Sequence, residues 1–226
     1  MILESITVGP FQENCYIIGD ESGEGALIDP GDEAARIALA VEQTGLEIAS
    51  IILTHSHIDH VGAVAELAEE YSCPVFLHAE AEEMLQAVPQ QAAMMGVKFG
   101  KVPAVDRYIG TGETLEIGGL GLRSLYTPGH APGHLAFYVE EEGLVVSGDA
   151  VFAGSVGRVD LPGGSMETLM KSISEEILPL PDDTRLYPGH GPATTVGEEK
   201  VNNPFLNGQM AHMGGMSGTG STGGSQ

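Results

Sequence analysis

The sequence predicts an α/β protein in which two mixed β-sheets pack together and helices cover their outer faces. Each half of the chain contains several short strand-like segments followed by segments with helical periodicity. In both halves, polar residues stand at the ends of the strand-like segments. The first half starts with paired strands before its strand–helix units, which disfavours a purely parallel, doubly wound sheet.

The first half is expected to form strands at 2–8, 14–18, 25–28, 50–53 and 74–77. Apolar residues at helical spacing predict a helix over 33–44, ending before Gly45, and a second over 60–71. Residues 79–105 are less regular, and a helix broken near Pro89 is expected there. Its methionines suit either a fixed cap over the sheet edge or a mobile lid over a substrate site.

The second half is expected to form strands at 114–117, 120–126, 134–139, 144–147 and 185–187. A helix is predicted over 166–177 with Ser165 as its cap, and a short last helix over 195–205 that stops at Pro204. We expect one folded domain over residues 1–206. The remainder, 207–226, is rich in Gly, Ser, Thr and Met, which predicts a flexible tail.

Composition excludes several classes of partner. The formal net charge of −23 leaves little to neutralise phosphates, so nucleic acid is not an expected partner. No apolar run is long enough to span a membrane, and the first residues do not resemble a signal peptide. Cys15 and Cys73 stand in apolar surroundings, which favours buried thiols, a reducing compartment and a cytoplasmic location. The sequence does not predict an oligomeric state.

The stretch from Thr54 to Gly62 reads T-H-S-H-I-D-H-V-G and follows a predicted buried strand. A polar turn would need none of its three histidines and one aspartate. Imidazole nitrogens and carboxylate oxygens are the ligands of zinc, iron and manganese in proteins. The pattern therefore predicts a metal site.

Three more ligand-type side chains follow predicted strands and are flanked by glycine, namely His130, Asp149 and His190. Glycine lets the backbone bend sharply and approach a ligand closely. Each position alone is a weak signal, but together with the histidine-rich stretch they predict a single site. His78 also follows a strand but lacks flanking glycines, so a structural role is favoured for it.

With these motifs the sequence resembles the metallo-β-lactamase superfamily, and within it glyoxalase II (hydroxyacylglutathione hydrolase). The runs F-A-G-S-V-G-R, from Phe152 to Arg158, and N-N-P-F, from Asn202 to Phe205, resemble a compact bacterial branch without the C-terminal helical domain. The resemblance implies a four-layer αβ/βα sandwich with its site at one edge. It also implies two divalent metal ions, with zinc expected and iron or manganese as alternatives.

The resemblance implies seven metal ligands. The first group, which would hold one ion, is His55, His57 and His130. The second group, which would hold the other ion, is Asp59, His60 and His190, and Asp149 would bridge the two ions. Residues two apart in an extended segment point the same way, so His55 and His57 can share an ion. Two ions can turn a water between them into a hydroxide near neutral pH. Asp59 would orient that hydroxide and so act as a catalytic residue.

Three other residues are expected to serve the site by resemblance. His134 would hold the loop or a ligand through a hydrogen bond without binding metal itself. Asp29 would support the site from behind, or else form only a turn. Arg158 would bind a carboxylate of glutathione through its fork, with a salt bridge to Asp160 as the alternative.

The expected substrate is a small molecule, and the expected reaction is hydrolysis of a thioester such as S-lactoylglutathione by the metal-bridging hydroxide. A persulfide dioxygenase with one iron, held by His57 or a near neighbour together with His130 and Asp149, is an alternative of the same fold. Lactone or ester hydrolysis is another, because the same hydroxide attacks esters. A relative without catalysis is disfavoured, since all seven ligand positions are filled.

Overall fold

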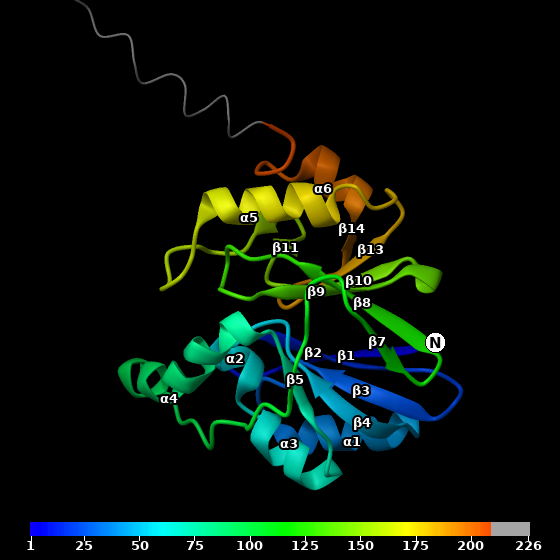
Figure 1. Cartoon of the computed structure of the whole chain (residues 1–226), viewed down its shortest axis with the longest axis vertical. Helices are drawn as coiled ribbons and strands as arrows, with labels where there is room; N and C mark the ends of the chain where they lie inside the picture. The colour runs from blue at the N-terminus through cyan, green and yellow to red at the C-terminus, as the bar shows by residue number, and fades with distance from the viewer. Residues whose placement is uncertain (209–226) are drawn as a thin grey trace, which may run out of the picture.

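Two six-stranded sheets pack face to face in the computed structural model, which describes residues 1–208 (Figure 1). The first sheet follows chain order: β1 (Ile2–Val8), β2 (Glu13–Gly19), β3 (Glu24–Ile28), β4 (Glu47–Ile52), β5 (Val75–Leu77) and β6 (Arg107–Tyr108). Strands β1 to β3 are antiparallel and β3 to β6 are parallel, so the sheet is mixed. The tail predicted from residue 207 lies outside the described residues from 209 onward.

The second sheet has the spatial order β14 (Thr194–Thr195), β13 (Arg185–Pro188), β10 (Leu144–Gly148), β9 (Leu135–Val139), β8 (Leu120–Tyr126) and β7 (Thr114–Ile117). Strands β10 and β13 are parallel, and the other pairs are antiparallel. This sheet is therefore mixed as well, which confirms the predicted fold class.

Helices cover the outer face of each sheet (Figure 1). On the first sheet these are α1 (Ala34–Thr44), α2 (Ile58–Val61), α3 (Val64–Tyr71) and α4 (Glu82–Met95). On the second they are α5 (Met166–Ser172), which continues as a π-helical segment (Ile173–Ile177), and α6 (Val196–Asn202). Ser165 caps α5 as predicted, because its side chain accepts a hydrogen bond from the Thr168 N–H.

Alternation along the strands explains the layers. In β2, Ile17 packs under the helices of the first sheet, while its neighbour Ile18 packs between the two sheets. The layer between the sheets also contains Ile52 from the first sheet and Phe137 from the second. Apolar residues on both faces of these strands are fully buried, so the core fixes where each strand ends and hence where the following polar residues lie.

Two helix predictions are wrong in detail. The helix predicted over 60–71 is divided into α2 and α3, because the segment between them packs on another loop. A Cβ on Gly62 would lie 2.2 Å from the Gly31 carbonyl oxygen, and the Ala63 N–H donates to the Pro30 carbonyl. The predicted break near Pro89 is absent. Helix α4 runs through this exposed proline because Leu85, Val88 and Ala92 bury one face of it. The short strands β6, β11 (Val151–Phe152) and β12 (Ser155–Val156) were not predicted.

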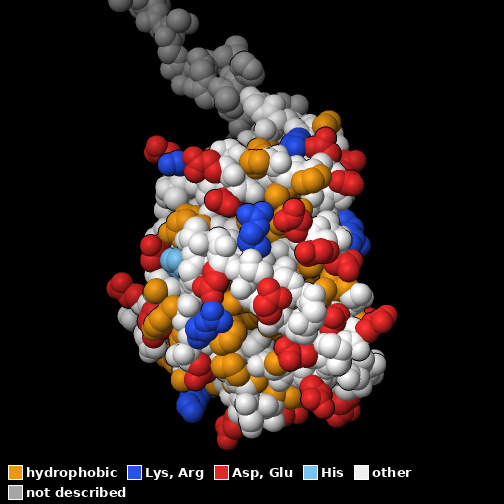
Figure 2. Space-filling model, turned by 45° about the vertical axis from the view of Figure 1, so that its right-hand side comes forward, with side chains coloured by type: hydrophobic (Ala, Val, Ile, Leu, Met, Phe, Trp, Pro, Cys, Tyr) orange, Lys and Arg blue, Asp and Glu red, His pale blue; other side chains and the backbone are white. Residues whose placement is uncertain are grey.

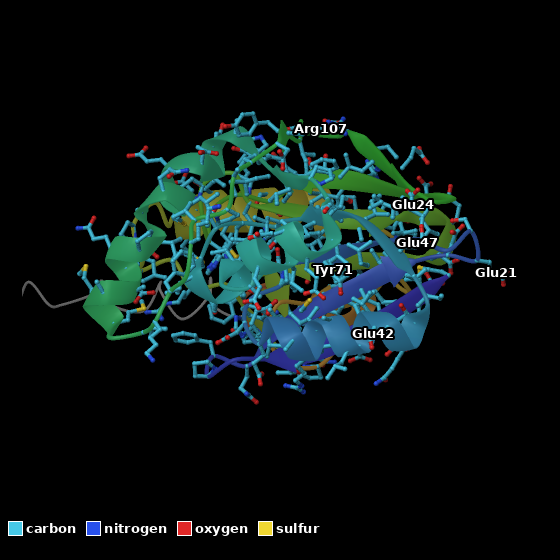
Figure 3. All side chains as sticks on the ribbon, turned by 90° about the horizontal axis from the view of Figure 1, so that it is seen from below. Glu21, Glu24, Glu42, Glu47, Tyr71 and Arg107 are labelled. Atoms are coloured by element: carbon cyan, nitrogen blue, oxygen red, sulfur yellow. The ribbon has the colours of Figure 1, made fainter. Side chains whose placement is uncertain are left out.

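Acidic side chains are spread over the face of the molecule shown in Figure 2. Glu21, Glu24 and Glu47 project from the end of the first sheet that lies away from α4 (Figure 3). Strands β3 and β4 begin near these residues, and the opposite end of β4 leads to the histidine-rich stretch. These acidic side chains are solvated and lie at the other end of the sheet from that stretch.

Two expectations from composition concern the cysteines and the membrane. Cys15 and Cys73 are both free and buried, as predicted, and burial raises the pKa of each thiol. Among the described residues, no helix combines the length and apolar character that a membrane span requires.

Candidate metal centre

The predicted ligands gather at one edge of the sandwich, where strands of both sheets end. His55 and His57 follow β4, and Asp59 and His60 lie on the short helix α2 directly after them. The other three positions come from the second sheet. His130 lies in the loop between β8 and β9, Asp149 follows β10, and His190 follows β13. Residues more than a hundred positions apart in the sequence are thus brought to one place.

The first group, His55, His57 and His130, offers one donor atom from each residue, all within 4.8 Å of one another. His55 Nε2 lies 3.1 Å from His57 Nδ1, and all three side chains are buried. Burial lowers the pKa of His57 to about 3 and also lowers the pKa of His55 and His130. These imidazoles are therefore neutral near neutral pH, which is the form that binds metal ions.

The second group, Asp59, His60 and His190, also offers donor atoms within 4.8 Å of one another. His190 Nε2 lies 3.3 Å from Asp59 Oδ2. Burial opposes ionisation of Asp59, but the hydrogen bond from His190 and the charge of His60 lower its pKa below the usual value. Asp59 is therefore a carboxylate near neutral pH, and a carboxylate with two imidazoles forms a common ligand set for divalent metals.

Asp149 lies between the two groups. Its Oδ1 is 3.5 Å from His60 Nε2, and its Oδ2 is 3.4 Å from His130 Nε2 and 3.6 Å from His190 Nε2. Burial opposes its charge, but the three histidines around it lower the pKa of Asp149 well below its usual value. The close approach requires Gly189, because a Cβ there would lie 2.2 Å from Asp149 Oδ1. Oδ1 thus faces the second group, Oδ2 lies near a histidine of each group, and the carboxylate approaches both groups.

Hydrogen bonds to the outer nitrogens fix the orientation of three histidine rings. His60 Nδ1 donates to Asp29 Oδ2 at 2.9 Å, His130 Nδ1 to the Arg158 carbonyl oxygen at 2.8 Å and His190 Nδ1 to the Gln12 carbonyl oxygen at 3.3 Å. When such a ring is neutral, the proton on Nδ1 leaves Nε2 free to bind a metal ion. Without metal, burial opposes protonation of His60 and His190, but the carboxylates beside them raise the pKa of both rings. This arrangement is typical of metal-ligating histidines.

Asp29 and His134 make the supporting contacts that the sequence led us to expect for them. Asp29 accepts hydrogen bonds from the N–H and hydroxyl of Thr54, in addition to the one from His60. His134 Nε2 accepts a hydrogen bond from the Asp149 N–H at 3.0 Å, and its Nδ1 lies 2.8 Å from the Thr127 hydroxyl. Both residues therefore hold a predicted ligand or its backbone in place.

Metal ions fit this set of side chains. Within residues 1–208, the buried side-chain atoms that have no hydrogen-bond partner include His60 Nε2, His130 Nε2 and Asp149 Oδ1. Unpartnered buried polar atoms are costly to a fold, and here they lie in the two neighbouring groups and in Asp149 between them. Cations bound at the two groups would satisfy all three.

Glu13 is a component of this region that the sequence did not indicate. It precedes the apolar strand residues of β2, is almost completely buried and lies with its Oε1 3.8 Å from His60 Nδ1. Neither carboxyl oxygen has a hydrogen-bond partner in the described part of the chain. Burial raises the pKa of Glu13 well above its usual value, with the charges of Asp29 and Asp59 adding to the effect and His60 opposing it. In the sequence, the only feature that could have indicated a role for Glu13 was its position as a charged residue before a mostly apolar strand.

We expect Glu13→Gln to stabilise the metal-free protein more at neutral pH than at acid pH. Between the ordinary carboxyl pKa of 4.5 and its raised value, the folded state binds more protons than the unfolded state, so stability falls as pH rises. Glu13→Gln cannot ionise at this position, so it does not lose stability in this way. The free energy of unfolding in urea, measured for the wild-type protein and Glu13→Gln across this pH range, checks the expectation, with the exposed Glu4→Gln as control. A stability difference that does not change with pH would contradict the expectation.

Arg158 and His78 illustrate the alternatives that the sequence left open. The Arg158 guanidinium donates two hydrogen bonds of 2.7 Å to Asp160, which is the salt bridge considered above. Arg158 also lines the cavity at the centre. His78 accepts a hydrogen bond from the Glu80 N–H at the start of a helical turn, which is a structural role.

A cavity of about 390 Å³ opens over the centre. Its floor carries ligand-type residues of both groups and Asp149, while Phe11, Met95, Phe152 and Leu161 contribute apolar walls. A few converging polar groups in an apolar pocket are typical of a site for a small molecule.

Comparisons with known proteins agree with this geometry. The family profile described as the metallo-beta-lactamase superfamily matches residues 8–190. Hydroxyacylglutathione hydrolase GloC of Haemophilus influenzae is 40% identical over 209 residues, covering 92% of this chain and 99% of that protein.

Two crystal structures are similar to this chain in both fold and sequence. The structure of TTHA1623 in a di-iron-bound form is 44% identical, with a TM-score of 0.84, and the match covers 90% of this chain and all of that one. The B3 metallo-beta-lactamase BLEG-1 is 36% identical, with a TM-score of 0.86, covering 92% of this chain and all of that one. The fold, the clustered histidines and aspartates and these similarities together show that the chain belongs to the metallo-beta-lactamase superfamily of metal-dependent hydrolases.

Proposed function

We propose that the protein is a dinuclear metal-dependent hydrolase of thioesters such as S-lactoylglutathione. The observation that carries this proposal is the position of Asp149, whose carboxylate lies 3.4 to 3.6 Å from histidines of both groups of ligand-type residues. A carboxylate so placed can bridge two ions. The name of the GloC relative supports a glutathione thioester as the substrate to test first.

In this proposal His55, His57 and His130 hold one ion, Asp59, His60 and His190 hold the other, and Asp149 binds both. Bound ions lower the pKa of a water molecule and polarise the substrate carbonyl. Zinc is expected, and iron and manganese suit the same ligands. Iron has added support from the similar structure in its di-iron-bound form.

The residues of the chain position the reactants. Asp59, whose Oδ2 lies 3.3 Å from His190 Nε2, would accept a hydrogen bond from the attacking water and direct it to the carbonyl carbon. The water oxygen forms a bond to that carbon, the C–S bond breaks, and the products are a carboxylic acid and a thiol. A thiol pKa near 8.5 makes the thiolate a good leaving group. That explains why no separate acid is required beside the sulfur.

Loading the protein with zinc, iron or manganese and measuring hydrolysis of S-lactoylglutathione tests the proposal. We expect thioester hydrolysis without oxygen consumption. Oxygen uptake with glutathione persulfide, together with one iron per chain, would instead support the persulfide dioxygenase. A lactone and a carboxylic ester in the same assay show whether hydrolysis extends to oxygen esters.

Asp29→Asn is expected to weaken metal binding at the group that contains His60. The substituted amide accepts on only one atom, so it cannot satisfy both Thr54 and His60 as the carboxylate does. Loss of such an outer partner lowers metal affinity or activity by about 10- to 100-fold. Competition for zinc with a chelating dye measures the change. Unaltered affinity for both ions would show that Asp29 does not orient His60.

A further inference from the structure

An apolar groove leads away from the candidate metal centre along helix α4. It has a volume of about 340 Å³ and lies between α4 and the loop that contains Leu161 and Pro162. Helix α4 contributes Met84, Gln91, Met94 and Met95 to it, residues spaced two helical turns and then one turn apart, so that they lie on one side of the helix. We call this cavity, including His57 at its inner end, the methionine groove.

The methionine groove is continuous with the cavity over the centre. His57, Gln91, Met95 and Leu161 line both cavities. His57 belongs to the first group of ligand-type residues, so a molecule that reacts at the centre can extend into the groove without crossing solvent. The groove is therefore part of the same binding site.

The charges around the groove do not favour an anionic group there. No Lys, Arg, Asp or Glu is among the residues that line it. A neighbouring cavity, which shares Met84 and Met94, is bordered by Glu80 and Glu83. Arg158, the one Lys or Arg that lines the cavity over the centre, has its fork occupied by Asp160. Among the residues that line the groove itself, a carboxylate would find no cation.

The methionines of the groove are unusually exposed for large apolar side chains. Met94 is 82% exposed and Met95 is 52% exposed, on a chain whose surface is otherwise strongly acidic. An apolar wall that is open to solvent and joined to a reactive centre marks a ligand surface. Methionine also adapts its shape to flexible alkyl chains because it has three rotatable bonds and a polarisable sulfur.

We propose that the methionine groove binds an uncharged alkyl chain of the substrate, so that within a series of otherwise identical thioesters the enzyme prefers a medium-length alkyl chain over a short one. This inference rests on the thioester hydrolase function proposed above and specifies the substrate class of that site. The chain belongs either to the acyl group or to the thiol. Both are apolar arms of one thioester, and the experiment separates them.

Two series of thioesters test the inference with the metal-loaded enzyme. One varies the acyl group from acetyl through butanoyl and hexanoyl to octanoyl on N-acetylcysteamine, and the other varies an alkyl thiol with a constant acetyl group. Burial of each methylene is expected to raise kcat/KM about threefold to fourfold in one of the series. The series that responds identifies the arm in the groove. A flat or falling profile in both series would overturn the inference.

A binding measurement keeps this test separate from the proposed function. S-hexyl- and S-methyl-N-acetylcysteamine are thioethers, which cannot be hydrolysed, and each is titrated into the protein by calorimetry. Tighter binding of the hexyl compound supports the groove even if no thioester is turned over, and equal binding overturns it. Absence of turnover with every thioester would refute the hydrolase proposal alone.

Met95→Glu places a charge in the wall at an exposed position of α4, where the fold tolerates it. In this variant we expect the preference for long over short chains to fall at least tenfold, and the hexyl thioether to lose its advantage. Leu39→Glu, which is 59% exposed on α1 and distant from both cavities, is the matched control and is expected to keep both. An unchanged chain-length preference in Met95→Glu would contradict a role for the groove.

Discussion

Asp149→Ala is expected to lower thioester hydrolysis by about a thousandfold and to leave fewer than two metal ions per chain. The side chain faces ligand-type residues of both groups, so its loss removes a ligand from each proposed ion. Each bound metal contributes several kcal/mol to stabilising the transition state, and every 1.36 kcal/mol changes the rate tenfold. Elemental analysis of the dialysed protein and a thioester assay measure the two effects.

The control for Asp149→Ala is Asp183→Ala, which removes an exposed aspartate that does not line the cavity over the centre. It is expected to keep full metal content and activity. A version of Asp149→Ala that retained both ions and normal turnover would show that the carboxylate does not bridge the two groups.

Asp59→Ala is expected to abolish hydrolysis while the first group still holds an ion. Asp59 belongs to the second group only, and its nearest partner is His190. Loss of the carboxylate removes both a ligand and the acceptor that orients the attacking water, so a decrease of about a thousandfold or more in kcat is expected. Metal analysis and steady-state kinetics on the same sample distinguish loss of an ion from loss of catalysis.

Asp59→Asn provides the comparison, because an amide keeps the size of the side chain and an oxygen that can accept a hydrogen bond. It is expected to retain more activity than Asp59→Ala. Thioester hydrolysis at the normal rate in Asp59→Ala would refute the proposed mechanism.

The sequence predicted the fold class and the gathering of the seven ligand-type residues. The histidine-rich stretch is local, and each distant residue, such as Asp149 or His190, has its own glycine-flanked position at the end of an apolar strand. These local patterns indicated ligand-type positions, and the resemblance to the metallo-β-lactamase superfamily implied that all seven share one site; both sheets do place such strand ends at one edge. The two sheets place these strand ends at the same edge because the buried core between them determines how the strands lie relative to each other.

Other parts of the site could not be predicted because they depend on tertiary contacts. Glu13 carries no motif, and its burial beside His60 appears only when β2 packs near α2. The backbone oxygens of Gln12 and Arg158 orient two histidines, and no side-chain pattern encodes that function. The methionines of α4 were recognised as a cap or lid, but continuity of their groove with the centre requires the loop at Leu161 to lie opposite them. Strand β11 is too short for its periodicity to be recognised.

The metal content of the active protein tests the central claim most directly. The protein is dialysed against limiting zinc, iron or manganese, and bound metal per chain is measured on the same sample as the rate of S-lactoylglutathione hydrolysis. The account predicts that activity appears as the second ion binds and is maximal at two ions per chain. Full thioester hydrolysis with a single ion, or no hydrolysis of any thioester with two ions bound, would contradict it.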